Sequence, residues 1–484
     1  MLLLRLVVAT PSLQFSAPVQ LAAVGTYMTG GQGVDDEHAF IRATSGWTAT
    51  RDGGKSWSTI TWSNRSSVSS AEDPTLQCTG WPPGGQGTDE QRCTFGNTLG
   101  DGYLYIYNAG RGTSTAACGA AAQCFCCRCR EDATKTKCEP KPLAPPQSSA
   151  AGVLLPHGVL RGVNVDVADK DANYTSLSST MSTTFFWDAS SKMWAFNTST
   201  HTMTFSGIPP PGVSCGNAKH AFGCPFRLSG RGYVRLADGT LVISAIVWAK
   251  RWANRDPTLA EEATSIVAFR SVNDGLEWTY AGLIVAARDA PSSEEGPNEN
   301  DLVLAGDGET ILCVFRMDAG DGPLTHRYAP YALASSTNGG TTWTREGSMG
   351  GGVGCARPRL LRSASGAVIL AGGRTHSGNH DTILWLHASA ASASAYAANG
   401  TWVAHSVSYW HNALEPNKSL HFTPEVNGSG GGTFRQTTSY TSLIKVGSDG
   451  SEGLVTYARH LPPFPDVAFS MSFVVVDEAS ESTT

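Results

Sequence analysis

Charged residues are scarce in this sequence. They make up 16% of its 484 residues, against roughly 25% in an average soluble protein, and the formal net charge is -6. A nucleic-acid binder needs clustered lysine and arginine to neutralise phosphates, so we expect no nucleic-acid partner. No window approaches the roughly 20 apolar residues of a membrane-spanning helix, so we expect no membrane span. No glycine run has the full G-x-x-x-x-G-K-S/T pattern of a phosphate-binding loop.

Glycine, tryptophan and apolar residues are abundant instead. The chain has 53 glycines, 13 tryptophans and 41% hydrophobic residues. This composition suits a large core with many turns, and it argues against disorder. It favours an all-β protein. An ordinary domain size of about 150 residues would give three domains, unless the chain is built from repeats.

The N-terminus reads MLLLRLVVATPSLQFSAPVQ. A short apolar run followed by the small residues Ser16 and Ala17 is typical of a signal peptide, here residues 1–17. Arg5 interrupts the run, and a first β-strand is the alternative. We expect a secreted or secretory-pathway protein. Glycosylation sequons support that route, at Asn64, Asn173, Asn197, Asn399, Asn417 and Asn427.

Six of the 12 cysteines fall in one segment, CGAAAQCFCCRCREDATKTKC, between Cys118 and Cys138. The C-x-x-C spacings in CFCCRC leave a zinc site open, but no second pair lies at zinc-ribbon distance and the cluster has no histidine. Disulfides are therefore the favoured interpretation, with a separate bridge between Cys215 and Cys224. The surrounding residues 78–149 are rich in Gly, Cys and Pro and predict an insertion that ends in a linker.

One octamer recurs along the chain, as TRDGGKSW (50–57), SVNDGLEW (271–278) and STNGGTTW (336–343). Asp or Asn caps the amides of a hairpin turn, Gly takes a positive φ angle and Trp packs back between sheets. FFWDASSKMW and YAANGTWV are blurred copies. The octamer resembles the Asp-box of the sialidase (neuraminidase) superfamily, whose members are β-propellers. In that family the box is structural and lies away from the active site.

Between the octamers, apolar runs flank Asp-Gly turns, as in YVRLADGTLVISAIVW and DLVLAGDGETILCVFR. Each such unit predicts a β-hairpin, and no amphipathic helix is apparent. The resemblance implies a six-bladed β-propeller over residues 18–77 and 150–478, interrupted by the insertion. Repeated blades also explain how so long a chain can form one domain.

The resemblance also implies site residues, mainly from residue 224 onward. Family members hold the substrate carboxylate with three arginines and use a Tyr nucleophile, a Glu base and an Asp acid/base. Arg227 in PFRLSG matches the first arginine, although Leu-Ser follows it where Ile-Pro is usual. Asp256 is the candidate acid/base residue, with Glu261 and Glu262 as rivals.

The segment NENDLVLAGDGETILCVFR resembles the hairpin that carries the family's base and second arginine. Glu299 would be the base on the nucleophile, and Arg316, 17 residues later, would be the second arginine. Because the turn lies between them, both ends of the hairpin can face one rim. The alternative is a surface salt bridge.

The third arginine is displaced. Asn379 and His380 occupy its usual place, so Arg374 is the candidate, with Arg357 and Arg359 as alternatives. Tyr440 in SYTSLIKV matches the nucleophile. The Glu that normally follows the second strand of that hairpin is missing from VTYAR.

Two functions follow from this resemblance. The first is a retaining exo-glycoside hydrolase that releases a terminal sialic or other acidic sugar from a glycan. It would act as a monomer and need neither metal nor organic cofactor. The second is a non-catalytic propeller that binds glycans or proteins on the same scaffold. The arginine set distinguishes them, because an enzyme needs its three arginines to converge.

Overall fold

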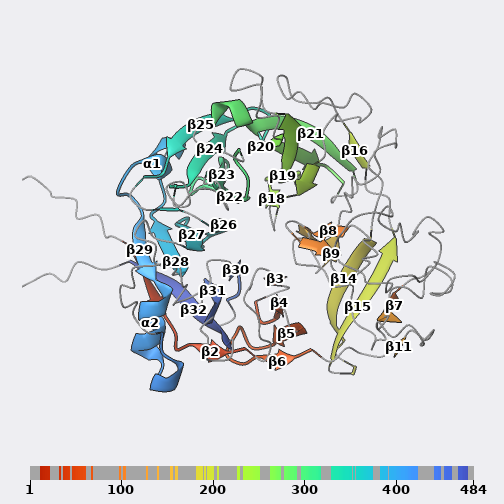
Figure 1. Ribbon diagram of the computed structural model, residues 1–484, viewed down its shortest axis with the longest axis vertical. Helices are drawn as coiled ribbons and strands as arrows, with labels where there is room; N and C mark the ends of the chain where they lie inside the picture. The colour runs from red at the N-terminus through yellow and green to blue at the C-terminus, as the bar shows by residue number, and fades with distance from the viewer. Residues whose placement is uncertain are drawn as a thin grey trace, which may run out of the picture.

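The computed structural model of the chain is all-β with few helices (Figure 1). It describes residues 11–21, 32–33, 36–43, 46–60, 67–68, 97–99, 102–104, 127–128, 139–140, 153–155, 159–161, 181–188, 190–191, 193–200, 204–206, 226–228, 233–250, 262–273, 277–290, 296–317, 329–350, 353–354, 356–373, 382–390, 392–422, 441–447, 452–459 and 467–477. In this part of the chain, no helix is both long enough and apolar enough to cross a membrane.

Several sheets of four or more strands stand around a common centre in Figure 1. The sheet that joins the two ends of the sequence contains β1 (Pro11–Phe15), β2 (Val19–Gln20), β30 (Ser442–Ile444), β31 (Gly453–Arg459) and β32 (Val467–Asp477). The next contains β3 (Gln32–Gly33), β4 (Ala39–Ala43), β5 (Gly46–Thr50) and β6 (Ser58–Thr59). A third contains β7 (Ser67–Val68), β12 (Val153–Leu155), β13 (Val159–Arg161), β14 (Met181–Asp188) and β15 (Met193–Thr200).

The second half of the sequence forms the sheets that matter most for the site. One contains β16 (Thr204–Ser206), β17 (Phe226–Leu228), β18 (Val234–Arg235), β19 (Leu241–Lys250), β20 (Glu262–Ser271) and β21 (Glu277–Val285). The next contains β22 (Asn300–Leu304), β23 (Ile311–Phe315), β24 (Ala332–Ser336) and β25 (Thr344–Ser348). The last contains β26 (Ala356–Arg362), β27 (Val368–Gly373), β28 (Thr382–His387) and β29 (Val403–Ser406). Paired strands are antiparallel, except that β7 pairs with β15 and β16 with β21 in parallel.

Where the side chains are described, successive sheets share hydrophobic cores and so pack face to face. One core joins Leu312 and Leu333 to Leu370 and Trp385 of the following sheet. Strands such as β23 (ILCVF) and β28 (TILWLH) are buried along their whole length. A strand covered on both faces needs a continuous apolar run and not an alternating one. In Figure 1, β22 and β26 lie nearer the centre than the later strands of their sheets.

The recurring octamers form turns with the same hydrogen bonds. In the first, Thr50 Oγ1 accepts from the Gly54 amide at 2.8 Å, and Asp52 Oδ1 accepts from the Ser56 amide at 2.9 Å. The equivalent bonds in the third octamer, both 2.9 Å, join Gly340 to Ser336 and Thr342 to Asn338. In the second, Asn273 Oδ1 accepts from the Glu277 amide at 2.9 Å. Each turn leads into the strand that comes last along the chain in its sheet. Trp57 and Trp343 directly precede that strand, and Trp278 is its second residue.

The Asp-Gly hairpins also form as the sequence indicates. In the turn between β22 and β23, Asp307 Oδ1 accepts from the amides of Glu309 and Thr310, both at 2.9 Å. Gly308 has φ 76°, a conformation that L side chains rarely adopt. This turn brings the residue before β22 opposite the residue after β23.

A few short helices accompany the strands, although the sequence shows no apparent amphipathic helix. The described residues include α1 (Ala393–Ala397), α2 (Val407–Leu414), and the short 3-10 helices η4 (Ala287–Asp289) and η5 (Lys418–Leu420). Ser406 caps α2 by accepting from the Tyr409 amide at 3.1 Å. The helix has only 8 residues, too few for its apolar spacing to stand out in the sequence.

The first strand lies within the residues predicted as a signal peptide. β1 pairs with β32, from Pro11 opposite Asp477 to Phe15 opposite Phe473, and Leu13 and Phe15 are buried. Cleavage after residue 17 would remove β1 from this sheet. The alternative interpretation, a first β-strand, matches residues 11–15.

Most of the predicted insertion, residues 78–149, lies outside the described residues. Within it the structure describes the short pairs β8 (Asn97–Leu99) with β9 (Gly102–Leu104) and β10 (Cys127–Arg128) with β11 (Glu139–Pro140). Disulfide formation in this cluster, and between Cys215 and Cys224, stays a prediction. Cys313 in β23 is buried and free, and burial raises its pKa. The even count of 12 cysteines therefore does not correspond to six disulfides within the chain.

Candidate active site

The β22–β23 hairpin places Glu299 and Arg316 opposite each other. Glu299 directly precedes β22, and Arg316 directly follows β23. The ladder continues past both strands, because the Arg316 amide donates to the Glu299 carbonyl at 2.8 Å and the Asn298 amide donates to the Arg316 carbonyl at 3.3 Å. Their side chains form an ion pair, with Arg316 Nη1 2.8 Å from Glu299 Oε2. The two ends of the hairpin therefore face one rim, and the two residues form the salt bridge that was the alternative interpretation, with both side chains mostly buried. Their roles as base and substrate-binding arginine stay predictions.

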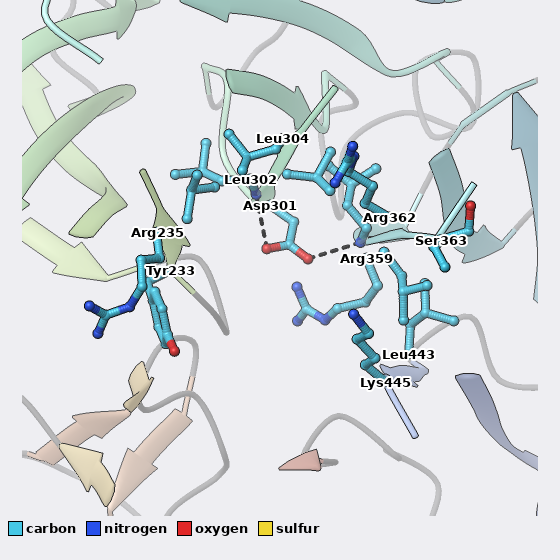
Figure 2. A pocket seen from close by; sticks show the side chains of 15 residues that line it. Tyr233, Arg235, Asp301, Leu302, Leu304, Arg359, Arg362, Ser363, Leu443 and Lys445 are labelled. Carbon is cyan, nitrogen blue, oxygen red and sulfur yellow. Dashed lines mark hydrogen bonds between the residues drawn. The ribbon is translucent and has the colours of Figure 1, made fainter. Parts of the chain in front are cut away.

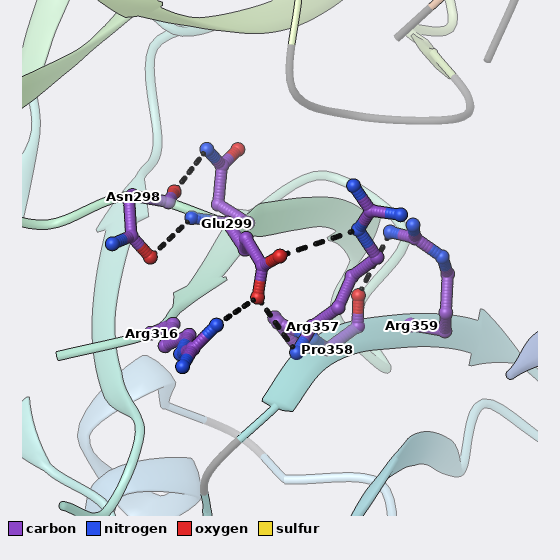
Figure 3. A network of polar contacts seen from close by, with 7 residues as sticks. Asn298, Glu299, Arg316, Arg357, Pro358 and Arg359 are labelled. Carbon is purple, nitrogen blue, oxygen red and sulfur yellow. Dashed lines mark hydrogen bonds and ion pairs between the residues drawn. The ribbon is translucent and has the colours of Figure 1, made fainter. Parts of the chain in front are cut away.

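A second arginine reaches the same carboxylate from the next sheet. The Arg357 amide donates to Glu299 Oε2 at 3.1 Å, and Arg357 Nε lies 3.8 Å from Oε1. Figure 3 shows the Glu299 carboxylate between the guanidinium groups of Arg316 and Arg357. Arg357 belongs to the start of β26, where the ladder with β27 is irregular between Ala356 and Arg359. A strand irregularity of this kind re-aims side chains and amides.

The three charged groups lie mostly out of water. The side chain of Arg316 is 6% exposed, that of Arg357 9% and that of Glu299 18%. Charges attract more strongly where water is excluded, but each also loses hydration when it is buried. Such a cluster is costly as a device for stability alone, and clusters of this kind are common at functional sites. The remaining exposure of Glu299 leaves its carboxylate within reach of a ligand.

Neighbouring amides hold the Glu299 backbone in place. Asn298 Oδ1 accepts from the Glu299 amide at 2.7 Å, and the Asn298 carbonyl accepts from Asn300 Nδ2 at 2.9 Å. Asn300 in turn accepts from Ser244 Oγ of β19 at 2.5 Å. Asn298 and Asn300 are both buried. This chain of bonds ties the position of Glu299 to two adjacent sheets.

The other residues predicted for the site are described only in part. Arg227 lies in β17, paired with Ile246 of β19. Glu262, a rival for the acid/base role, is the first residue of β20 and pairs with Lys250. Asp256, Glu261, Arg374 and Tyr440 lie outside the described residues, so their predicted roles remain predictions. The chain is described again from Thr441, where it leads directly into β30.

The sequence named Arg357 only as an alternative third arginine, and its contact with Glu299 was not foreseen. Arg359, the other alternative, is 2% exposed and donates through Nη1 to the Pro358 carbonyl at 2.9 Å. The signal that could have found Arg357 is its place at the start of a first strand, the same place that Glu299 has in the preceding sheet. Among the described residues, no group of three or more His, Cys, Asp or Glu could hold a metal ion.

This arrangement suits the binding of an anion next to a base. Two guanidinium groups flank one carboxylate, and guanidinium is the natural partner of a carboxylate ligand. The Glu299 carboxylate can accept a proton from a neighbouring hydroxyl.

No protein-family model matches the chain, and no curated protein matches it. Solved structures resemble it over most of its length. A protein of unknown function from Dyadobacter fermentans has 12% sequence identity and a TM-score of 0.45, over 96% of this chain and 100% of that one. The Trypanosoma rangeli sialidase has 9% identity and a TM-score of 0.43, over 96% of this chain and 60% of its own length. An α-L-arabinanase from Penicillium chrysogenum has 11% identity and a TM-score of 0.41, over 96% of this chain and 98% of its own.

Proposed function

We propose that this protein is a sialidase-like, retaining exo-glycoside hydrolase built as a six-bladed β-propeller, which releases a terminal sialic or related acidic sugar from glycans. The observation that carries the proposal is the buried Glu299–Arg316 ion pair at the end of the β22–β23 hairpin, with Arg357 on the same carboxylate. The sequence motifs place a base and a carboxylate-binding arginine at these two positions. The recurring octamer turns support the propeller.

The chemistry explains why these residue types would be needed. The anomeric carbon of a sialic acid carries a carboxylate, which would repel a carboxylate nucleophile, so a neutral phenol is the better choice. In the first step Tyr440 Oη bonds to the anomeric carbon and its proton passes to Glu299, while Asp256 protonates the leaving oxygen as that glycosidic bond breaks. In the second step water attacks the anomeric carbon and gives a proton to Asp256. The bond to Tyr440 Oη breaks as the bond to water forms, and Tyr440 recovers its proton from Glu299.

The arginines would hold the sugar during both steps. Arg316 and Arg227 match the family pattern in sequence, and Arg374 is the predicted third member. Arg357 is an alternative third member, because its guanidinium already lies beside Glu299. Convergence of charged donors on one carboxylate orients the anomeric carbon for attack.

Tyr440→Phe tests the proposal. Removing only the reacting oxygen should preserve packing and glycan affinity, while turnover of a fluorogenic sialoside should fall by several orders of magnitude. Wild-type protein should form a covalent adduct with a fluorinated sialoside, detected by intact mass, and the variant should not. Tyr409→Phe is the matched control, because Tyr409 is 65% exposed on α2, and it should behave as wild type.

The alternative function is a non-catalytic propeller that binds glycans or proteins. It would be supported if the wild type neither turns over the sialoside nor forms the adduct, while sialylated glycans still bind and Arg316→Ala weakens that binding.

A further inference from the structure

The strands β22 and β26, whose starts form the Glu299 cluster, also line a cavity further along. A cavity of about 410 Å³ is lined by β18, β22, β26 and the end of β30 (Figure 2). On β22 its wall starts at Asp301 and runs to Leu304, away from Glu299. On β26 and the turn after it, the wall runs from Arg359 to Ala364, away from Arg357. Neither Glu299, Arg316 nor Arg357 contributes to this wall.

The wall is strongly cationic. Its charged side chains are Asp301 and four cations, Arg235, Arg359, Arg362 and Lys445. The whole protein has a formal net charge of -6, so this local excess of positive charge runs against the composition. A concave site lined by one sign of charge concentrates ligands of the opposite sign.

Asp301, the one carboxylate among the lining residues, accepts hydrogen bonds from backbone amides of β22 and β26. Asp301 is 6% exposed, and its Oδ1 accepts from the Leu302 amide while its Oδ2 accepts from the Leu360 amide, both at 3.0 Å. It therefore lies at the floor with Arg359, which is 2% exposed. In Figure 2 the Arg359 guanidinium and the Lys445 side chain lie on the same side of the Asp301 carboxylate, and Tyr233 lies across the cavity.

The charge becomes more accessible toward the mouth. Arg235 and Arg362 are half-buried, and each donates to a turn carbonyl, Arg235 to Gly239 at 3.2 Å and Arg362 to Gly306 at 2.9 Å. Those bonds direct both guanidinium groups toward hairpin turns, away from the Asp301 carboxylate (Figure 2). Lys445, at the end of β30, is exposed. A ligand that enters the cavity would therefore meet Lys445 first and Arg359 last.

Apolar and hydroxyl groups complete the wall. Half-buried leucines from three strands, Leu304, Leu360 and Leu443, line it, and Tyr233 contributes a hydroxyl. A bare inorganic ion would leave the apolar wall unused. A sugar ring offers apolar C–H faces and hydroxyls together. The volume lies within the roughly 300–1,000 Å³ of ligand sites in proteins.

We infer that this cavity binds a sulfated saccharide of about disaccharide size, at a site separate from Glu299. The ligand's anionic groups pair with Lys445 and with the cations deeper in the cavity, and its ring faces contact the leucines. This inference does not depend on the proposed hydrolytic activity.

Isothermal titration calorimetry with a disulfated chondroitin disaccharide tests it, with the unsulfated disaccharide as the comparison ligand. We expect the wild type to bind the disulfated ligand at one cavity site, and the affinity to fall with added NaCl because salt screens the charges. Lys445→Glu should weaken binding by about tenfold or more. Lys445→Arg should retain it. Lys418→Glu, which reverses an exposed lysine on η5, should bind as the wild type does.

Three outcomes would overturn the inference. They are no binding by the wild type, equal affinity for the sulfated and unsulfated disaccharides, or an affinity that Lys445→Glu leaves unchanged. If Arg316→Ala abolishes the heat signal and Lys445→Glu does not, the saccharide binds beside Glu299 and this cavity is not its site. If the wild type binds the disulfated disaccharide but does not hydrolyse the sialoside, the result counts against the proposed function alone.

Discussion

Glu299 and Asp301 lie two residues apart at the start of β22, and both accept a hydrogen bond from a backbone amide of β26, Glu299 from Arg357 and Asp301 from Leu360. Residues two apart on a strand face the same side, so one sheet presents both carboxylates to the next. Their surroundings differ. Glu299 is flanked by two guanidinium groups and keeps 18% side-chain exposure, whereas both Asp301 oxygens accept backbone amides and the residue is 6% exposed.

Under the proposed function, this difference separates a proton-accepting group, Glu299, from a structural one, Asp301. A carboxylate at the start of β22 that accepts a hydrogen bond from a backbone amide of β26 can serve either purpose. A carboxylate whose oxygens are all committed to amides stabilises the joint between sheets. One that keeps more solvent exposure can also exchange protons and meet a ligand.

Substituting each carboxylate by its amide gives the largest expected contrast. Glu299→Gln should lower sialoside turnover by about 10²–10⁴-fold, because the amide cannot take the phenol proton. The free energy of unfolding of the Glu299→Gln variant should change much less than its activation free energy for turnover. Asp301→Asn should lower the free energy of unfolding by about 1–3 kcal/mol, because the amide nitrogen cannot accept from a backbone N–H.

Kinetics and urea denaturation of the two variants measure this contrast. Equal losses of turnover would mean that the two carboxylates do not differ in role. Combining Glu299→Gln with Tyr440→Phe should cost little more than either change alone, because the pair acts as a unit.

Arg316 tests the cationic side of the comparison. Arg316→Ala should raise KM strongly and lower kcat, for a fall of roughly 30- to 1,000-fold in kcat/KM, because a full arginine–carboxylate contact is worth on the order of 2–4 kcal/mol. Arg316→Lys keeps the charge but loses the fork geometry, so it should recover only part of the loss. Wild-type kinetics in the alanine variant would remove Arg316 from the site.

His411 separates the pH dependence of the fold from that of the site. Burial lowers the pKa of His411 to about 4, and its Nδ1 lies 2.9 Å from the Tyr457 hydroxyl while Nε2 lies 3.2 Å from the Leu420 carbonyl. Because Leu420 can only accept, Nε2 carries the proton and Nδ1 accepts from Tyr457. The folded protein holds this imidazole neutral, whereas the unfolded chain protonates it below a pKa of about 6.5.

Stability from this group is therefore fully present above about pH 6.5 and is lost as the pH falls toward 4. We expect the free energy of unfolding to decrease by about 2 kcal/mol between pH 7 and pH 5 on account of His411. Urea denaturation at both pH values measures the change, and His411→Gln should reduce it. If that variant keeps the full wild-type pH dependence, another group is responsible. Any change in turnover over this range that His411→Gln preserves belongs to the site.

Local features could be predicted from the sequence because they depend on residues close along the chain. The octamer turns form from bonds that span two to four residues, as between Asp52 and Ser56. Glu299 and Arg316 could be paired because one hairpin joins them. The helix α2 could not be predicted from the sequence. Its few residues are helical because Ser406 caps the helix and because His411 packs against Phe422 and Phe469.

The sequence by itself determined which segments make strands, where their hairpins turn, and that a glutamate and an arginine meet at one hairpin's end. Short-range backbone geometry and apolar spacing are enough for those features. Only the tertiary structure decided that Arg357, 58 residues away, completes the Glu299 cluster, that β1 pairs with β32 across the whole sequence, and that four cations line one cavity. Those contacts cross between sheets. They depend on how neighbouring sheets pack and on the irregularity in β26, which residue spacing does not reveal.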